Sequence, residues 1–348
     1  MRDTTRPESA ASDINAGGAL RLRWWAAAAG LAIAAVLLGS AADAPAHAQL
    51  NPIEVENAQS GDPEWELMKP ATNREIEGYA SLPSVAKGGA IDLYVNTASS
   101  TYSLEVFRTG WYDGDGARRL FGPVQLKGTN QGPVPMPDAT TGIVEASWID
   151  PYTLNVGQNW TTGVYLARLT ESSGGYQSYI IFVVRDDSRA ADLLLQLPVA
   201  TYQAYNFWGG KSAYDMGSCN PDDPNDPVPC DFPWGTGYGA QAVKVSFDRP
   251  YAASTNAVAS HGMGAGEYLT NVQPVAESYP ISSDGWDYNT VRFLEREGYD
   301  VTYSTDLDTH VASVGDLTKH EAILIIGHDE YWSWEMRENV EDAIATGT

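Results

Sequence analysis

The sequence predicts two domains of different fold class, a β-sandwich followed by an α/β domain, behind an export signal. Short β-rich runs separated by Gly, Pro, Asn and Ser fill residues 53–185, a pattern typical of an immunoglobulin-like sandwich. From residue 191 onward, compact apolar runs alternate with helical periodicity, which indicates a parallel sheet covered by helices. The polar stretch 186–189 separates the two patterns, so we expect domains at 49–187 and 188–348.

Residues 1–48 have the three parts of a secretion signal in the expected order. Arg21 and Arg23 supply positive charge, the run 24–38 is apolar, and Ala46-His47-Ala48 is a small-x-small cleavage site. An uncleaved membrane anchor is the alternative, because the apolar segment approaches the ~20 residues that span a bilayer. We expect cleavage after this segment, no membrane attachment afterwards, and a secreted protein located outside the cell or in its envelope.

The chain is strongly acidic, with a formal net charge of −24 at pH 7. This charge argues against nucleic acid as a partner, because phosphate binding needs clustered Lys and Arg. Its simplest interpretation is solubility of an exported protein, although a preference for cations stays open. Roughly 300 residues remain after cleavage, enough for two hydrophobic cores.

Four β-rich runs are the expected strands of the first domain: 91–95, 102–107, 163–169 and 179–184. In the second domain we expect strands in 191–197, 299–303 and 321–327, and helices over 288–297 and 334–345. Gly298 and Gly347 are expected to end the two helices. Since a doubly wound domain would continue into another strand after Gly347, we expect the second domain to be truncated and the chain to be a fragment.

Both cysteines, Cys219 and Cys230, fall in one loop rich in Pro and Asp. In an oxidising compartment the pair is expected to form a local disulfide. A catalytic thiol and a metal site are weaker alternatives, because the loop has neither CxxC spacing nor a histidine.

Three segments follow expected strands and are therefore candidates for a functional site. They are 201–212, the turn 327–333, and 243–251, where a strand-like segment ends in a polar turn. The turn carries His328, Asp329 and Glu330, an imidazole and two carboxylates. The favoured interpretation is that Asp329 or Glu330 only caps the following helix, and a catalytic or metal role is the alternative.

Tyrosines are frequent in the other two segments. Tyr202, Tyr205 and Tyr251 are either buried structural residues or metal ligands, since phenolate oxygen suits a hard ferric ion.

Nucleophilic catalysis and phosphate binding have little support. The chain contains no G-x-S-x-G elbow, and neither cysteine lies at a strand end. Ser260-His261-Gly262 has the composition of a glycine-rich loop, and Trp208 to Ser212 lacks the first glycine of a phosphate loop.

The segments 204–212, 247–251 and 327–333, with the turn 110–118 upstream, resemble motifs of a family named for the C-terminal domain of the N,N-dimethylformamidase large (β) subunit. The resemblance implies a glutamine-amidotransferase-like α/β fold without the cysteine nucleophile. It also implies a mononuclear ferric iron, held by two tyrosines and a glutamate, that hydrolyses a small amide in partnership with a small subunit.

Carried over motif by motif, the implied iron ligands are Tyr205, Tyr251 and Glu330, with Tyr202 in reserve for Tyr205. His328 would stand beside them as a supporting or proton-transfer group, so His328 and Glu330 are the implied catalytic residues. On this interpretation the protein is an iron-dependent hydrolase of the C–N bond of a small amide.

The competing hypothesis is a catalytically inactive, exported binding module for a polysaccharide or protein partner. Its basis is the content of 11 Trp and 19 Tyr, since these side chains suit sugar stacking and interfaces. The expected partners are therefore a small-molecule amide or a glycan ligand, and a small subunit or a second copy of the chain.

Overall fold

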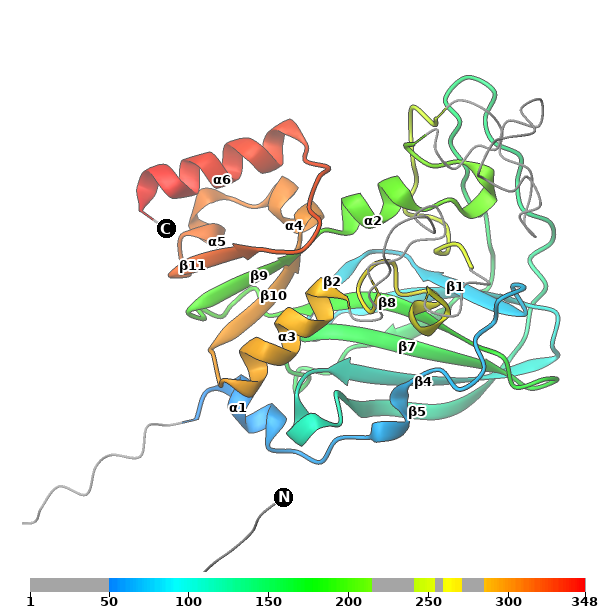
Figure 1. The fold of residues 1–348 in the computed structure, drawn as a ribbon, viewed down its shortest axis with the longest axis horizontal. Coiled ribbons are helices and arrows are strands. Elements are labelled where there is room, and N and C mark those ends of the chain that lie inside the picture. Colours follow the sequence, from blue (N-terminus) through cyan, green and yellow to red (C-terminus); the bar gives the residue numbers. More distant parts are fainter. Residues whose placement is uncertain (1–49, 215–240, 254–258, 271–284, 348) are drawn as a thin grey trace, which may run out of the picture. The chain divides into compact units, whose positions relative to one another are not determined.

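The computed structural model describes residues 50–214, 241–253, 259–270 and 285–347, which form a mixed α and β fold rich in strands (Figure 1). The expected export signal and the loop that carries Cys219 and Cys230 lie outside these residues. Among the residues described, none of the helices is both long and apolar enough to cross a membrane.

The first eight strands form two sheets. The smaller sheet is antiparallel and has the order β1 (Ile76–Ala80), β3 (Ala90–Thr97) and β6 (Tyr152–Asn155). The larger sheet has the order β2 (Ser84–Ala86), β8 (Gln177–Arg185), β7 (Gly163–Glu171), β4 (Thr101–Thr109) and β5 (Ala117–Lys127). Its pairs are antiparallel except β2 with β8. The four strands expected from the sequence are confirmed as parts of β3, β4, β7 and β8.

An apolar core lies between the two sheets. Alternate residues of β3, Ile91, Leu93 and Val95, are buried in it, as the two-residue period of a strand requires. In contrast, β8 is buried at nearly every position because its sheet is covered on both faces. The second face packs into another core, where Val164 and Ile181 meet residues of the C-terminal sheet.

The C-terminal sheet is parallel and has the order β10 (Val301–Thr305), β9 (Leu193–Leu197) and β11 (Ala322–Ile325). The chain also forms helices α1 (Pro52–Asn57), α2 (Val199–Tyr205), α3 (Trp286–Arg296), α4 (Asp306–Val311), α5 (Val314–Leu317) and α6 (Trp334–Thr346). Four short 3-10 turns complete the described elements: Pro63–Trp65, Tyr112–Gly114, Trp208–Gly210 and Ala259–Gly262.

Helices cover both faces of this sheet. Leu317 of α5 and Ala343 of α6 pack on Leu194 on one face, where Figure 1 shows α4, α5 and α6 together. On the other face, Val291 of α3 packs in the same core as Tyr303. The strands expected in 191–197, 299–303 and 321–327 and the helices expected over 288–297 and 334–345 are thereby confirmed.

Two local predictions are wrong. The residue that caps α6 is Ser333, whose side chain accepts a hydrogen bond from the Met336 amide, so neither Asp329 nor Glu330 is the cap. Residues 243–251 form no strand and are held by tertiary contacts such as the bond from the Ala146 amide to the Asp248 carbonyl, 2.6 Å long. The C-cap at Gly347 is confirmed, since this residue has φ 108°.

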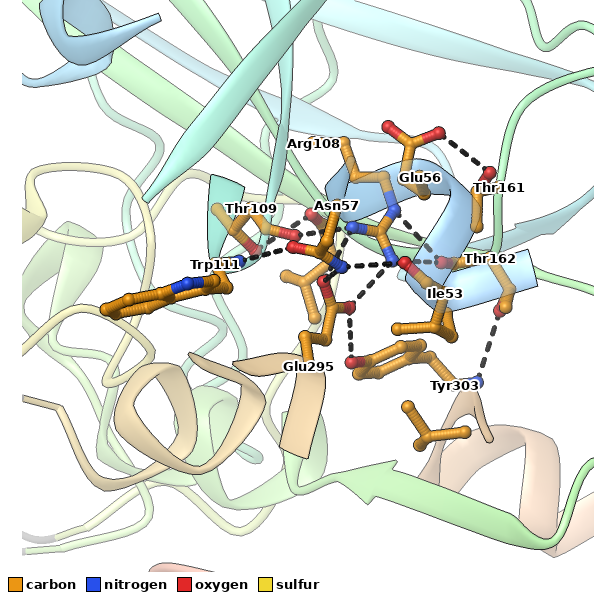
Figure 2. Close-up of polar contacts among 12 residues, drawn as sticks. Ile53, Glu56, Asn57, Arg108, Thr109, Trp111, Thr161, Thr162, Glu295 and Tyr303 are labelled. Carbon is orange, nitrogen blue, oxygen red and sulfur yellow. Dashed lines mark hydrogen bonds and ion pairs between the residues drawn. The ribbon is translucent and has the colours of Figure 1, made fainter. Parts of the chain in front are cut away.

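A fully buried ion pair joins the larger sheet to α3 (Figure 2). Arg108 on β4 donates two hydrogen bonds to Glu295, from Nη2 to Oε1 at 2.7 Å and from Nη1 to Oε2 at 2.9 Å. Tyr303 of β10 and Asn57 of α1 also donate to this carboxylate, at 2.6 and 2.8 Å. Because these hydrogen bonds replace those to water, the buried charges are satisfied and fix four elements together.

Candidate functional site

The candidate site lies at the carboxyl ends of the parallel strands. The register pairs Leu197 at the end of β9 with Thr305 at the end of β10, and Gln196 with Ile325 at the end of β11. Helix α2 starts just after β9 and ends at Tyr205, while the turn 326–333 follows β11. Parallel pairing therefore brings two of the candidate motifs to one edge of the sheet.

Tyr205, His328 and Glu330 are in direct contact there. Tyr205 Oη donates to Glu330 Oε2 at 2.8 Å, and His328 Nε2 lies 2.9 Å from the same oxygen. The distance from Tyr205 Oη to His328 Nε2 is 3.4 Å. Three of the residues implied by the family resemblance thus converge, although 125 positions separate Tyr205 from Glu330.

Tyr214 also belongs to this cluster, and the sequence interpretation missed it. Its Oη donates to Glu330 Oε1 at 2.7 Å, and its ring centroid lies 4.3 Å from that of Tyr205. Both carboxylate oxygens of Glu330 therefore accept hydrogen bonds from phenols. The only signal for Tyr214 in the sequence is its place directly after the 204–212 motif.

Residues of β9 and α2 hold the turn that carries His328 and Glu330. Thr201 Oγ1 accepts hydrogen bonds from the backbone amides of Glu330 and Tyr331, at 2.9 and 3.1 Å. Asp329 accepts from Gln196 Nε2 and from Trp332 Nε1, each at 2.8 Å. Asp329 is thus engaged in shaping the turn, while Glu330 projects toward the tyrosines with 46% of its side chain exposed.

Tyr251 occupies a neighbouring position. Its ring stands edge-on to that of Tyr202, with 6.4 Å between the centroids, and both rings lie against Gly266. Among the residues that the structure describes, Tyr251 has no direct hydrogen bond to Tyr205 or Glu330, although burial and the nearby charges of Asp306 and Glu267 raise its pKa.

Tyr202, the reserve candidate, points elsewhere. It is fully buried, and its hydroxyl donates to Asp287 Oδ2. Tyr205 rather than Tyr202 is therefore the tyrosine of its motif that meets Glu330.

Glu267 is a further site residue that the sequence interpretation missed. It is 9% exposed, and its Oε2 lies 3.3 Å from His328 Nδ1. Burial is the main cause of the raised pKa of the Tyr205 and Tyr251 phenols and of the Asp287 carboxyl, and the charge of Glu267 also contributes. The loop that carries Glu267 has no periodic pattern that would have pointed to it.

The environment shifts the pKa of His328, Glu330 and Tyr205. The hydrogen bond that His328 donates to Glu267 is the main reason that the pKa of His328 is raised to about 8, so its imidazole is mostly protonated at neutral pH. Although burial alone would raise it, hydrogen bonds from Tyr214, Tyr205 and His328 hold the pKa of Glu330 below its ordinary value. Burial raises the pKa of Tyr205 to about 12.

Comparison with known proteins places the chain in a family. A family profile described as "N,N-dimethylformamidase beta subunit-like, C-terminal" matches residues 103–348. The chain belongs to this family. The matched region starts in β4 and contains the turn 110–118 and all three motifs from which the site is built.

Other comparisons add little to this family assignment. No curated protein matches the chain. Among solved structures, murine CEACAM1b is aligned over 35% of this chain and 63% of its own length, at 14% identity and a TM-score of 0.17. The alignment thus spans less than two thirds of that structure, and a TM-score this low supports no conclusion about fold or function.

The donor chemistry of this family member suits a hard cation. Four carboxyl groups, Glu267, Asp287, Asp329 and Glu330, lie within electrostatic reach of the His328 imidazole, and Asp306 lies within reach of Asp329. Burial raises the pKa of Asp287 to about 7 and that of Asp306 to about 8. Asp287 Oδ1 is buried without a hydrogen-bond partner in the described part of the chain. This surplus of buried oxygen would be relieved by a positive charge.

The site brings a phenol oxygen and a carboxylate oxygen together. Within the described residues, no group of three or more His, Cys, Asp and Glu side chains is arranged to hold a metal ion. Tyr205 and Glu330 already place one phenol and one carboxylate oxygen 2.8 Å apart, which is the donor type that ferric iron prefers.

Proposed function

We propose that the protein is an exported, iron-dependent hydrolase of the C–N bond of a small amide. Tyr205, Tyr251 and Glu330 would hold a mononuclear ferric ion in a glutamine-amidotransferase-like domain. The observation that carries the proposal is the 2.8 Å contact between Tyr205 Oη and Glu330 Oε2, which joins two separate family motifs at the carboxyl ends of parallel strands.

Of the three proposed ligands, Tyr251 has the least direct support. Its assignment rests on the motif 247–251, which falls within the family match. Its ring lies beside Gly266, next to the Glu267 carboxylate that contacts His328. This position puts the phenol at the border of the cluster.

A ferric ion, when bound, would act as a Lewis acid that polarises the amide carbonyl and makes water more acidic. The chain itself would supply the proton that the leaving amine requires. His328 keeps its proton at neutral pH and lies 2.9 Å from Glu330, so it is placed to protonate the amide nitrogen. Tyr214, which binds the other oxygen of Glu330, would fix the orientation of that carboxylate.

The first test is iron content. The mature chain, reconstituted with ferric iron, should bind about one equivalent and show a visible phenolate-to-iron charge-transfer band. Tyr205→Phe should lose the band and most of the iron. Tyr299→Phe is the matched control, because it removes an exposed phenol that precedes β10, at the other end of the strand from the site, and it should keep both.

The second test is amine release from small formamides by the iron-loaded protein. A folded chain that binds no iron under reconstitution would refute the metal-dependent function and favour the exported binding module. Partnership with a small subunit, or with a second copy of the chain, is part of the proposal and can be measured by light scattering on the same samples.

A further inference from the structure

We propose that Glu267 is a positioning residue, whose carboxylate holds His328 through Nδ1 and thereby aims Nε2 at Glu330 and Tyr205. This inference rests on the proposed function, since the ring that Glu267 holds is the proposed proton donor. The geometry from which it is inferred involves only side chains of this protein.

The His328 ring is held at both of its nitrogens by carboxylates. Nδ1 lies 3.3 Å from Glu267 Oε2, and Nε2 lies 2.9 Å from Glu330 Oε2. The Tyr205 ring stands near edge-on to the imidazole, with 4.9 Å between the centroids. Contacts at opposite nitrogens define the rotation of the ring, so loss of either one would free it.

Of the two carboxylates, Glu267 is the one with a fixed position. Only 11% of its side chain is exposed, against 46% for Glu330. Its loop is attached to the larger sheet, because the Tyr179 amide of β8 donates to the Met263 carbonyl at 2.9 Å. The buried hydroxyl of Tyr268 also lies 2.6 Å from Thr109 Oγ1 on β4.

Close packing fixes the backbone beside Glu267 as well. Gly266 has φ +61°, and a Cβ atom there would lie only 2.9 Å from Tyr202 and 3.2 Å from Tyr251. The larger sheet therefore sets the position of the Glu267 carboxylate, and the carboxylate sets that of His328.

The charges around Glu267 point to His328 as its partner. Within the described part of the chain, the charge of Glu267 also acts on Tyr202, Tyr205, Tyr251 and Asp287, and none of these four can become a cation. Arg249 lies close to Tyr251, but its guanidinium donates to the backbone carbonyls of Trp208, Lys211 and Gln203. A buried carboxylate needs a donor, and His328 Nδ1 supplies it.

The test uses the metal-free mature chain with 15N-labelled histidine, so that it is independent of iron binding. At pH 9.5, where the His328 ring is neutral, two-bond 15N–1H correlations report which nitrogen carries the proton. The parent should show a larger fraction of the Nδ1–H form than free imidazole does, because Glu267 accepts from Nδ1 and competes with Glu330, which faces Nε2. Glu267→Leu should convert the signal to a mixture dominated by the Nε2–H form that free imidazole prefers.

Two conservative variants separate positioning from packing. Glu267→Gln keeps an acceptor oxygen in place and should keep the Nδ1–H form. Glu267→Asp keeps the charge but withdraws the carboxylate by one bond. This variant should lower the fraction of the Nδ1–H form, and it provides the comparison if Glu267→Leu does not fold. The matched control is Glu335→Gln, which removes an exposed carboxylate 3.7 Å from His310 Nδ1 and should leave His328 unchanged.

A folded Glu267→Leu or Glu267→Asp protein that keeps the parental His328 tautomer would overturn the inference. In the iron-loaded enzyme, Glu267→Leu should lower kcat by about ten-fold or more, with KM nearly unchanged, while Glu267→Gln should lose less. The tautomer measurement does not require iron. It therefore tests the role of Glu267 even if the protein binds no iron, and a failure of the proposed function can be told apart from a failure of this inference.

Discussion

Arg108 and Glu295 form a two-point ion pair in which neither side chain is exposed. The pair connects β4 of the larger sheet with α3, which covers the C-terminal sheet (Figure 2). Arg108 also donates to the Thr162 carbonyl at 2.8 Å, and Tyr303 donates to Glu295. The Glu267 loop is attached to the larger sheet, and the Glu330 turn follows β11 of the C-terminal sheet. The relative placement of these two segments therefore depends in part on this pair.

Removing one partner should be strongly destabilising. Arg108→Met would leave the Glu295 carboxylate buried without its cation, so we expect a loss of about 3–5 kcal/mol in the free energy of unfolding. Urea denaturation measures this loss. Glu295→Gln should behave similarly, and the double variant should lose less than the sum of the two single changes.

The matched control is the exposed pair of Arg337 and Glu341, which have a similar N–O distance of 2.7 Å but 62% and 58% exposed side chains. Arg337→Met should cause a much smaller loss than Arg108→Met, because water replaces the exposed ion pair. Equal losses for the buried and the exposed pair would contradict the role assigned to Arg108.

Activity should fall as the pH rises through about 8. The pKa of His328 is raised to about 8, chiefly by the hydrogen bond with Glu267, so its protonated form is abundant at pH 7 and scarce at pH 9. If His328 protonates the leaving amine, kcat of the iron-loaded protein should decrease over this interval. His328→Gln should have a low kcat without that decrease, and a parental kcat that rises through pH 8 would rule out the acid role.

The metal-free protein should lose stability between about pH 4 and pH 7 because of Asp287. Burial raises the folded-state pKa of this carboxyl to about 7, whereas an unfolded aspartate has a pKa of about 3.9. Between these values the folded state binds the extra proton, so the free energy of unfolding decreases as the pH rises, by at most about 1.4 kcal/mol per pH unit.

Asp287→Asn removes this titration while its amide oxygen can still accept the bond from Tyr202. Relative to the parent, the variant should therefore be about 2 kcal/mol more stable at pH 8 than at pH 5. Urea denaturation at both pH values, after treatment with a chelator, gives the comparison. A stability difference that does not depend on pH would contradict a folded-state pKa between pH 5 and pH 8 for Asp287.

Features that depend on local patterns could be predicted from the sequence. The apolar runs of β9 and β11 and the glycine at the end of α6 are local signals, and parallel pairing then brings Tyr205 close to Glu330. The cap of α6 was misassigned because acidic residues and Ser333 stand close together, and only the geometry shows which side chain reaches the Met336 amide.

Features that depend on tertiary contacts could not be predicted. The segment 243–251 has strand-like composition, yet it bonds to separate loops, for example through Asn206 Nδ2 to the Pro250 carbonyl at 2.8 Å. Glu267 and Tyr214 follow no strand and belong to no periodic face. Each joins the site only because the chain folds back on it, which a one-dimensional pattern does not encode.

The close packing at Gly266 leads to the last prediction, because it connects stability with the site. Gly266→Ala would force a left-handed conformation on alanine and press its Cβ against Tyr202, which is fully buried and hydrogen-bonded to Asp287. We expect a loss of about 2–3 kcal/mol, roughly half of it from the left-handed backbone. Gly132→Ala isolates that half, since Gly132 has φ +88° and nothing within 4 Å of an added Cβ. Urea denaturation of both variants should therefore show a loss for Gly132→Ala about half as large as that for Gly266→Ala. Equal losses would mean that Tyr202 and Tyr251 move to make room for the new methyl group, and that the loop carrying Glu267 is not rigid.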